Sequence, residues 1–335
     1  MSDVIHGGLD DRELASLGRT RAEVVDLSAS LHPYGPPAAV MRALREAEVD
    51  RYPSADASPL REALAALHRV APECVVVTSG ASAAIYLASA ALIAPGDRCA
   101  VLGPTFGEYA PAVEAVGGGV AGSDEPADVA WLCNPNNPTG TYLDRPAVDA
   151  IRHRVRHLLI DAAYESLVED RWDAIDLVRE DAPVVVVHSL TKLFAIPGLR
   201  IGYAIAPASV AALLRRRQPP WPVGRADIAA GLAAIEVIEE RMATVPALHD
   251  RRRRLERVFT DLDVAVTASR TNFVLAEVGD APRFRSALLT RGFVVRDATS
   301  FGLPACVRIA VPAEAQMERL ASAIREAYAD VRGAR

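Results

Sequence analysis

The sequence predicts an α/β protein with a large, doubly wound domain around a mainly parallel sheet and a smaller α+β domain. From residue 75 onward, short apolar strands alternate with helical patterns. These strands are almost continuous runs of valine, isoleucine and leucine, which is typical of strands buried on both faces by helices. The chain has 335 residues, half of them apolar, and this length is enough for two domains.

The strands expected in the large domain lie at residues 74–80, 99–104, 129–135, 157–164, 183–190 and 200–207. A helix at 81–93 follows the first strand. The segment 213–224 contains three prolines and a glycine, which indicates a linker or an active-site loop. In a sheet of this kind, ligands bind at the carboxyl ends of the strands.

The pattern changes after the proline-rich segment. Helices are expected at 225–242 and 247–262, and the remainder predicts the small α+β domain. Its expected elements are strands at 272–278, 293–297 and 307–311, a helix at 281–291 and a closing helix from about Ala313. The predicted division is an N-terminal segment at 1–50 that packs with the small domain, a large domain at 51–245 and a small domain at 246–335.

Composition excludes several classes of protein. The net charge of −6 and the pI near 5.7 argue against a nucleic-acid binder. No apolar run reaches the ~18 residues of a membrane span, and the N-terminus has no signal-peptide core. We therefore expect a soluble, cytoplasmic protein that binds neither nucleic acid nor membrane.

Two further patterns have ordinary structural interpretations. The four cysteines are dispersed without metal-ligand spacing, so we expect buried apolar residues and no metal site. The arginine run 251–254 could suggest a polyanion patch, but its helical spacing with Leu248 and Leu255 favours a solvated helix face.

Lys192 is the only lysine in a chain whose lysines and arginines together number 37. Surface charge does not explain it, because arginine serves that role everywhere else. A guanidinium stays protonated at any reachable pH, whereas an ε-amine can lose its proton in a suitable environment and attack a carbonyl. Schiff-base chemistry needs that amine. The alternative is a leftover surface lysine.

Candidate cofactor ligands surround Lys192 or end other strands. Ser189 precedes it and Arg200 follows it, and a hydroxyl with a bidentate guanidinium suits a phosphate group. The stretch TSGAS at 78–82 joins a strand to a helix, where backbone N–H groups can bind an anion, although a plain turn is the alternative. Asp161 ends an apolar strand; it could pair with a protonated ring nitrogen or cap a helix. Together these groups point to pyridoxal 5′-phosphate (PLP).

Four motifs carry a resemblance to a known family. They are SLTKLFAIPGLRIGY (189–203), NPNNPTG (134–140), DAAY (161–164) and PTFGEYAPAVEAVG (104–117). Over almost the whole chain, the sequence resembles the PLP-dependent fold type I, class I/II aminotransferases. Within that family it is similar to the branch of histidinol-phosphate aminotransferase and threonine-phosphate decarboxylase.

The resemblance implies roles for the residues that match the motifs. Lys192 would form the Schiff base with PLP and then carry the proton. Asp161 would bind the pyridine nitrogen, while Asn137 and Tyr164 would bind the ring hydroxyl. Tyr109 would stack on the cofactor face. The cofactor phosphate would be held by Ala81, Ser82, Ser189 and Arg200.

The resemblance also implies substrate contacts and a partner. Arg308 matches the arginine that binds the substrate α-carboxylate. Tyr52 matches a tyrosine that reaches the cofactor phosphate of the neighbouring subunit, which implies a homodimer with shared active sites. The other expected substrate-binding residues are Arg296, His32, Tyr34 and Gly35.

The sequence departs from the family in segments that face the substrate. Ser30 and His32 stand where relatives commonly have asparagine, and so does Gly224. In DAAY, Ala162 stands where many relatives have glutamate. The amino acid and keto acid substrates are therefore less well defined than the cofactor.

Transamination and decarboxylation both remain open at this point. If Arg308 holds the carboxylate in the ring plane, Lys192 removes the Cα proton and transamination follows. If a second anionic group takes Arg308, the carboxylate can leave as carbon dioxide. The motif HGG (6–8) and residues 295–311 are more similar to threonine-phosphate decarboxylase.

Arg296 could bind a substrate phosphate or form a surface ion pair with Asp297. We favour an aminotransferase, with decarboxylation of O-phospho-L-threonine as the alternative. A catalytically silent protein of the same fold is a third possibility, which the intact Lys192, Asp161 and Arg200 argue against.

Overall fold

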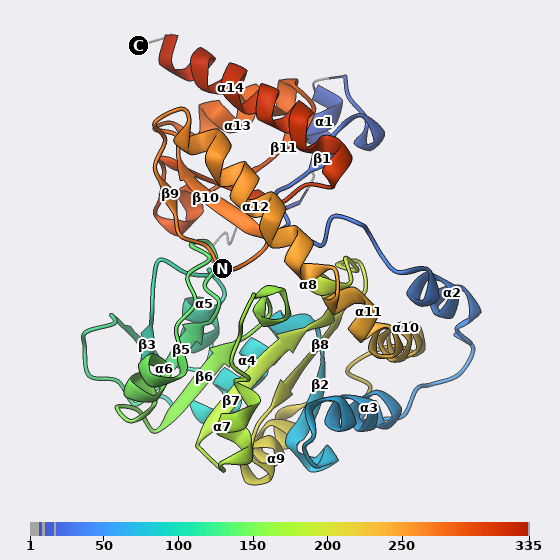
Figure 1. Cartoon of the computed structure of the whole chain (residues 1–335). Coiled ribbons are helices and arrows are strands. Elements are labelled where there is room, and N and C mark those ends of the chain that lie inside the picture. Colours follow the sequence, from blue (N-terminus) through green and yellow to red (C-terminus); the bar gives the residue numbers. More distant parts are fainter. Residues whose placement is uncertain (1–6, 9–10, 17, 334–335) are drawn as a thin grey trace.

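The computed structural model describes residues 7–8, 11–16 and 18–333, and it contains two packed units (Figure 1). The larger unit is built on a seven-stranded sheet, and the smaller one on a four-stranded sheet. This is the doubly wound α/β architecture with a smaller α+β unit that the sequence predicts. The predicted residue boundaries of the domains stay a prediction.

The large sheet is parallel except at one strand. Its order is β2 (Val75–Ser79), β8 (Ile201–Ile205), β7 (Val184–Ser189), β6 (His157–Asp161), β5 (Val129–Cys133), β3 (Arg98–Val101) and β4 (Gly119–Ala121). Strand β8 runs antiparallel to both of its neighbours. Only the four-residue helix α8 (Leu190–Leu193) lies in the connection from β7 to β8, too short for a crossover to a parallel neighbour.

Helices cover both faces of this sheet, as the apolar strands predict. One face carries α4 (Gly80–Leu92), α5 (Tyr109–Glu114) and α9 (Ala208–Arg217). The other carries α2 (Ala38–Glu46), α3 (Ser58–His68), α6 (Arg145–Arg152), α7 (Ile175–Arg179), α10 (Arg225–Glu236) and α11 (Ile238–Met242). Alternate strand residues enter alternate cores: Val184 and Val186 face one, and Val185 and Val187 the other.

The small unit holds the antiparallel strands β12 (Arg296–Asp297), β13 (Cys306–Ala310), β10 (Phe273–Glu277) and β9 (Val266–Thr267). Beside them, β1 (Val25–Asp26) pairs in parallel with β11 (Phe293–Val294). The helices of this unit are α1 (Asp11–Ser16), α13 (Ala281–Thr290) and α14 (Met317–Gly333). Short 3₁₀ helices lie at Arg21–Glu23, Pro72–Cys74, Glu165–Leu167, Thr299–Phe301 and Glu314–Gln316.

Helix α12 (Val245–Thr260) connects the two units (Figure 1). Val245 and Leu248 at its start belong to the core of the large unit, whereas Leu255 and Phe259 belong to that of the small unit. The N-terminal segment is also divided, because β1 joins the small unit while α2 packs on α10. Among the described residues, no helix combines the length and apolarity that a membrane span needs.

The prediction that 251–254 form a solvated helix face is wrong for half of the run. Arg251 and Arg252 are buried, with 4% and 8% of their surface exposed. Arg251 donates to the Tyr34 hydroxyl at 2.8 Å, and Arg252 pairs with Glu256. Arg253 is exposed and pairs with Glu169, so the arginine run covers both a buried and an exposed face of the helix.

Candidate active site

Two connected cavities lie where β5, β6 and β7 end. The inner cavity has a volume of about 100 Å³ and the outer cavity about 300 Å³. Six residues line both of them: Ser82, Phe106, Asn137, Tyr164, Lys192 and Arg200. Ala81, Asp161 and Ser189 line the inner cavity, while Arg296 and Arg308 line the outer one. The structure therefore brings most of the predicted site residues together.

Lys192 lies in the short helix that follows β7. Its Nζ is 5.6 Å from the centre of the Tyr164 ring and 3.5 Å from the Ala29 carbonyl oxygen. The Lys192 carbonyl accepts a hydrogen bond from the His32 amide at 3.0 Å. The amine thus projects into the cavity, which contradicts the interpretation as a leftover surface lysine.

Asp161 ends β6 and is 4% exposed. Burial raises the pKa of its carboxyl group, while hydrogen bonds from the Ala163 amide and the Tyr109 hydroxyl oppose that shift. These bonds are 2.9 Å to Oδ1 and 2.8 Å to Oδ2. The hydrogen bond from the Ala163 amide closes a local turn. The Asp161 carboxylate also lines the inner cavity, so its role is not limited to capping the next segment.

The stacking role predicted for Tyr109 requires correction. Tyr109 is fully buried behind Asp161, and its ring stacks on Trp131 with centroids 5.1 Å apart. The aromatic side chain that lines both cavities is Phe106. Tyr109 begins helix α5 and turns toward the core, whereas Phe106 lies in the loop that follows β3. Position at a strand end was the signal that could have identified Phe106.

The other side of the inner cavity is suited to an anion. Helix α4 begins here, and its first amides belong to Gly80, Ala81 and Ser82. A Cβ added at Gly80, whose φ is +78°, would lie 2.5 Å from Nη2 of Arg200, so the guanidinium packs directly against the helix start. Ser189 lies nearby on the cavity wall, where its Oγ is 2.7 Å from Thr191 Oγ1.

Arg308 is a buried cation at the wall of the outer cavity. It is 4% exposed, donates to Asn137 Oδ1 through Nη1, and donates to the Ser28 carbonyl through Nη2 at 2.5 Å. Its Nε is buried without a hydrogen-bond partner among the described residues. Burial lowers the pKa of this guanidinium, which indicates that an anion would be bound favourably here.

Arg296 lies opposite Arg308 in the pairing of β12 with β13. It is only 7% exposed, which contradicts the alternative of a surface ion pair with Asp297. Its Nη2 donates to Ser300 Oγ at 2.6 Å, and its guanidinium lies 5.3 Å from the centre of the Phe301 ring. Two buried arginines therefore share the outer cavity.

The three N-terminal residues predicted to bind substrate lie outside both cavities. His32 is buried with its Nε2 2.8 Å from Thr244 Oγ1, and burial lowers its pKa to about 3. Tyr34 contacts Arg251, and the Gly35 carbonyl accepts from Arg241. These contacts correct the prediction, because the segment packs against the α11–α12 junction instead.

Tyr52 also lies outside the cavities, and it is 81% exposed. Its ring contacts that of Trp221, with centroids 5.0 Å apart. Trp221 is itself 49% exposed, and its amide donates to the Ala55 carbonyl at 2.8 Å. The segment 52–55 and the proline-rich loop thus form an exposed aromatic pair.

Sequence reasoning missed a buried polar pair beneath the site. Glu165 follows Tyr164, and its Oε2 lies 3.9 Å from Nδ1 of His188, which precedes Ser189. Arg171 donates to the same oxygen at 3.4 Å. Burial raises the pKa of Glu165 to about 7 and holds that of His188 well below its ordinary value. Neither side chain lines the two cavities, so we expect an effect on stability.

We expect Glu165→Gln to stabilise the protein at high pH. The folded-state pKa of Glu165, about 7, exceeds the ordinary 4.5, so its contribution to stability is greatest below pH 4.5 and declines as pH rises to 7. When the pH rises from 5 to 8, the free energy of unfolding of the variant, relative to that of the wild type, should increase by about 2–3 kcal/mol. Urea unfolding of both proteins at both pH values measures this change. The same difference in free energy of unfolding at pH 5 and at pH 8 would contradict the prediction.

The donor set of the inner cavity fits PLP. One side offers a helix start, hydroxyls and a guanidinium for a phosphate. The other side offers the buried Asp161 carboxylate, whose raised pKa a cationic ring nitrogen would reverse. The Lys192 amine lines the cavity between these groups.

Comparisons with known proteins agree with this chemistry. The family model described as aminotransferase class I and II matches residues 22–124 and 120–324. The chain is 30% identical over 330 residues to the histidinol-phosphate aminotransferase of Symbiobacterium thermophilum, covering 92% of this chain and 91% of that relative. It is 32% identical over 351 residues to the threonine-phosphate decarboxylase of Salmonella typhimurium, covering 96% and 95%.

A solved structure shares the fold. The crystal structure of histidinol-phosphate aminotransferase from Sinorhizobium meliloti in complex with pyridoxal-5′-phosphate superposes with a TM-score of 0.85. The two chains are 22% identical, and the superposition covers 97% of this chain and 96% of the other. At this identity the likeness concerns the fold alone.

Proposed function

The chain belongs to the aminotransferase class I and II family, and from this premise we propose that its amino donor is a phosphorylated amino compound or an L-amino acid with a second anionic group. The protein is a PLP-dependent aminotransferase. The single observation behind the substrate proposal is that Arg296 and Arg308, both buried, line one cavity with Lys192. Two such cations match either one phosphate group, which carries close to two negative charges, or two separate anionic groups.

The roles of the cofactor ligands are part of the proposal. Asp161 would face the ring nitrogen, and Asn137 and Tyr164 the ring hydroxyl. Phe106 would take the stacking role in place of Tyr109, because it lines the cavity. The phosphate would be held by the α4 amides, including that of Ala81, together with Ser82, Ser189 and Arg200.

Two residues carry separate parts of the proposed reaction: Arg308 binds the substrate and Lys192 transfers a proton. Bound PLP supplies an aldehyde that reacts with amines and a ring that accepts electrons from the substrate α-carbon. Arg308 orients the substrate by holding one anionic group with its planar fork. Lys192 then accepts the α-proton and returns it to another position. A keto acid is the proposed acceptor of the amino group.

Decarboxylation of O-phospho-L-threonine is the second candidate. It is supported by the pairing of Arg296 with Arg308 on adjacent strands and by the likeness to a threonine-phosphate decarboxylase. If the phosphate occupied Arg308, the carboxylate would be free to leave as carbon dioxide. The choice between the two reactions depends on which anion each arginine binds.

One experiment separates the candidates. The holoenzyme is mixed with O-phospho-L-threonine, and separately with L-histidinol phosphate, without any keto acid. We expect a single conversion of the cofactor absorbance that resumes when 2-oxoglutarate is added. Sustained release of carbon dioxide would establish the decarboxylase instead, and no change with either compound would overturn the proposed substrate class.

We also propose a homodimer in which Tyr52 reaches the cofactor phosphate of the other subunit. The exposed pair of Tyr52 and Trp221 is the support, because a second copy would bury its apolar surface. The cytoplasmic location expected from the sequence stays a prediction.

We expect sedimentation equilibrium to give about twice the chain mass of 35.7 kDa. Tyr52→Phe should keep that mass but weaken cofactor binding about tenfold, because one hydrogen bond to a charged phosphate is lost. Equilibrium dialysis of PLP measures the affinity. A monomer at micromolar concentration, or unchanged affinity in the variant, would contradict the proposal.

A further inference from the structure

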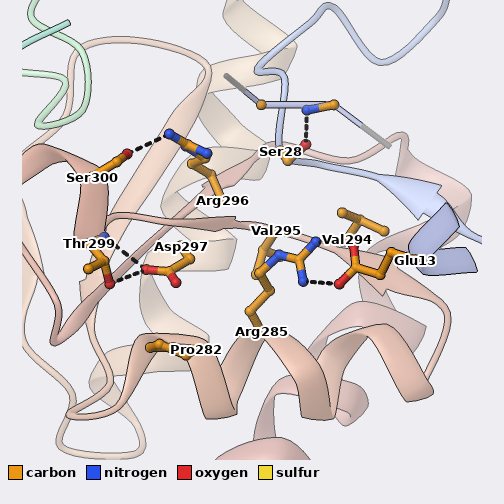
Figure 2. Close-up of a pocket in the computed structure, with 12 residues that line it drawn as sticks. Glu13, Ser28, Pro282, Arg285, Val294, Val295, Arg296, Asp297, Thr299 and Ser300 are labelled. Carbon is orange, nitrogen blue, oxygen red and sulfur yellow. Dashed lines mark hydrogen bonds and ion pairs between the residues drawn. The ribbon is translucent and has the colours of Figure 1, made fainter. Parts of the chain in front are cut away.

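A further cavity lies beside the catalytic one, inside the small unit. This distal cavity has a volume of about 640 Å³ and lies between the N-terminal segment, β11–β12 and α13. Figure 2 shows Glu13 and Arg285 in contact with each other on its wall, with Arg296 directed toward Ser300. Gly7 and Gly8, which belong to the HGG motif, also line it.

The distal cavity adjoins the outer catalytic cavity. Gly7 and Arg296 line both of them, so Arg296 stands at the junction. A molecule bound at Lys192 and Arg308 could therefore extend past Arg296 into the larger space. The combined space exceeds what a compact amino acid needs.

Three arginines follow this route from the catalytic cavity into the distal one. Arg308 lies in the outer cavity, Arg296 at the junction and Arg285 on the distal wall. Burial lowers the pKa of Arg296 to about 10, and the charges of Arg308 and Arg285 contribute further. Neighbouring cations repel one another in a partly desolvated space, so an anion along the route would bind favourably.

Glu13 now provides that anion for Arg285. Its two carboxylate oxygens accept from Nη1 and Nη2 of the guanidinium, the second at 2.5 Å. Glu13 comes from α1, a helix of six residues, and the side chains of Glu13 and Arg285 are 32% and 24% exposed. A carboxylate in this position occupies the fork that an anionic ligand would use.

We propose that the distal cavity receives the far end of the amino substrate and that Arg285 is a specificity-determining residue, which exchanges Glu13 for a substrate anion. This inference rests on the proposed function and narrows its substrate class to amino compounds with a phosphate or carboxylate group at the far end. Arg296 and Arg308 then bind groups nearer the amine. Glu13 competes with the ligand, and short or uncharged substrates leave the Glu13–Arg285 pair intact.

The competition gives two variants with effects of opposite sign. Arg285→Gln removes the cation, so an anion should bind about tenfold more weakly. Glu13→Gln removes the competing carboxylate, so the same anion should bind several-fold more tightly. If the Glu13–Arg285 pair served only to hold α1 in place, both variants would instead bind the anion more weakly.

The matched control is Arg291→Gln. Arg291 is the C-cap of the same helix α13, its side chain is 25% exposed, and it pairs with Glu326 and Asp330. The Arg291→Gln variant therefore loses comparable ion pairs, but at a place away from the cavity. We expect this variant to bind anions like the wild type.

The experiment is calorimetric titration of the PLP-loaded enzymes with inorganic phosphate and with glutarate. If phosphate binds more tightly than glutarate, the far end of the substrate carries a phosphate group. If glutarate binds more tightly than phosphate, it carries a carboxylate. The inference is overturned if neither anion binds the wild type, or if Arg285→Gln and Glu13→Gln change affinity in the same direction or like the control. Cofactor absorbance with amino donors tests the proposed function separately, because it follows the reaction at Lys192 and not the binding of an anion at Arg285.

Discussion

Lys192→Arg is expected to lose catalysis by at least about a thousandfold, since both covalent attachment to the cofactor and proton transfer depend on one amine. Arginine keeps the positive charge and nearly the length of lysine. Its guanidinium does not release a proton at any pH that the protein tolerates, so it can neither attack a carbonyl nor accept the α-proton. The substitution therefore tests the chemistry of the amine rather than its charge.

The measurement combines kcat with the absorbance of the cofactor. The variant should leave PLP with the spectrum of the free aldehyde while thermal unfolding stays close to that of the wild type. Lys192→Ala serves as a second variant, and added methylamine should restore part of its activity by replacing the missing amine. Turnover by the arginine variant close to the wild-type rate would remove Lys192 from the mechanism.

The sequence predicted the parts of the fold that depend on local patterns. Buried strands such as β7, which begins with the apolar run at residues 184–187, are recognised by residue type, and their position and two-sided burial follow from it. The antiparallel direction of β8 is set by the short connection from β7, a constraint on chain length rather than on residue type. Strand β4 has only three residues, two of them exposed, and leaves no comparable signal.

The site shows the same division between local and long-range information. Lys192, Asp161 and Arg200 lie at strand ends or next to them, where the topology brings ligands together. Phe106 was missed because the direction of an aromatic ring depends on whether its loop faces the core or the cavity. His32 and Arg251 were misassigned because their partners, Thr244 and Tyr34, lie about 200 residues away in the chain.

Asp161→Asn is expected to reduce kcat on the order of a hundredfold or more, a loss typical of removing one charge-stabilising group from an active site. The amide is nearly the same size, and its oxygen can still accept from the Ala163 amide, while its NH2 group would donate to the Tyr109 hydroxyl instead of accepting from it. What it lacks is the negative charge that would balance a protonated ring nitrogen. A small change in kcat would therefore contradict the proposed role of the carboxylate.

Tyr109→Phe is the matched control, because it keeps the carboxylate and its burial but removes the 2.8 Å hydrogen bond to Oδ2. That bond lowers the pKa of Asp161, so its loss should raise this pKa and move the acid limb of the kcat profile to higher pH. On the plateau above this acid limb, Tyr109→Phe should stay within about tenfold of the wild type. Asp161→Asn should remain slow at every pH, because no pH restores a charge to an amide. If Tyr109→Phe were as slow as Asp161→Asn on that plateau, the hydroxyl and not the carboxylate would be the essential group.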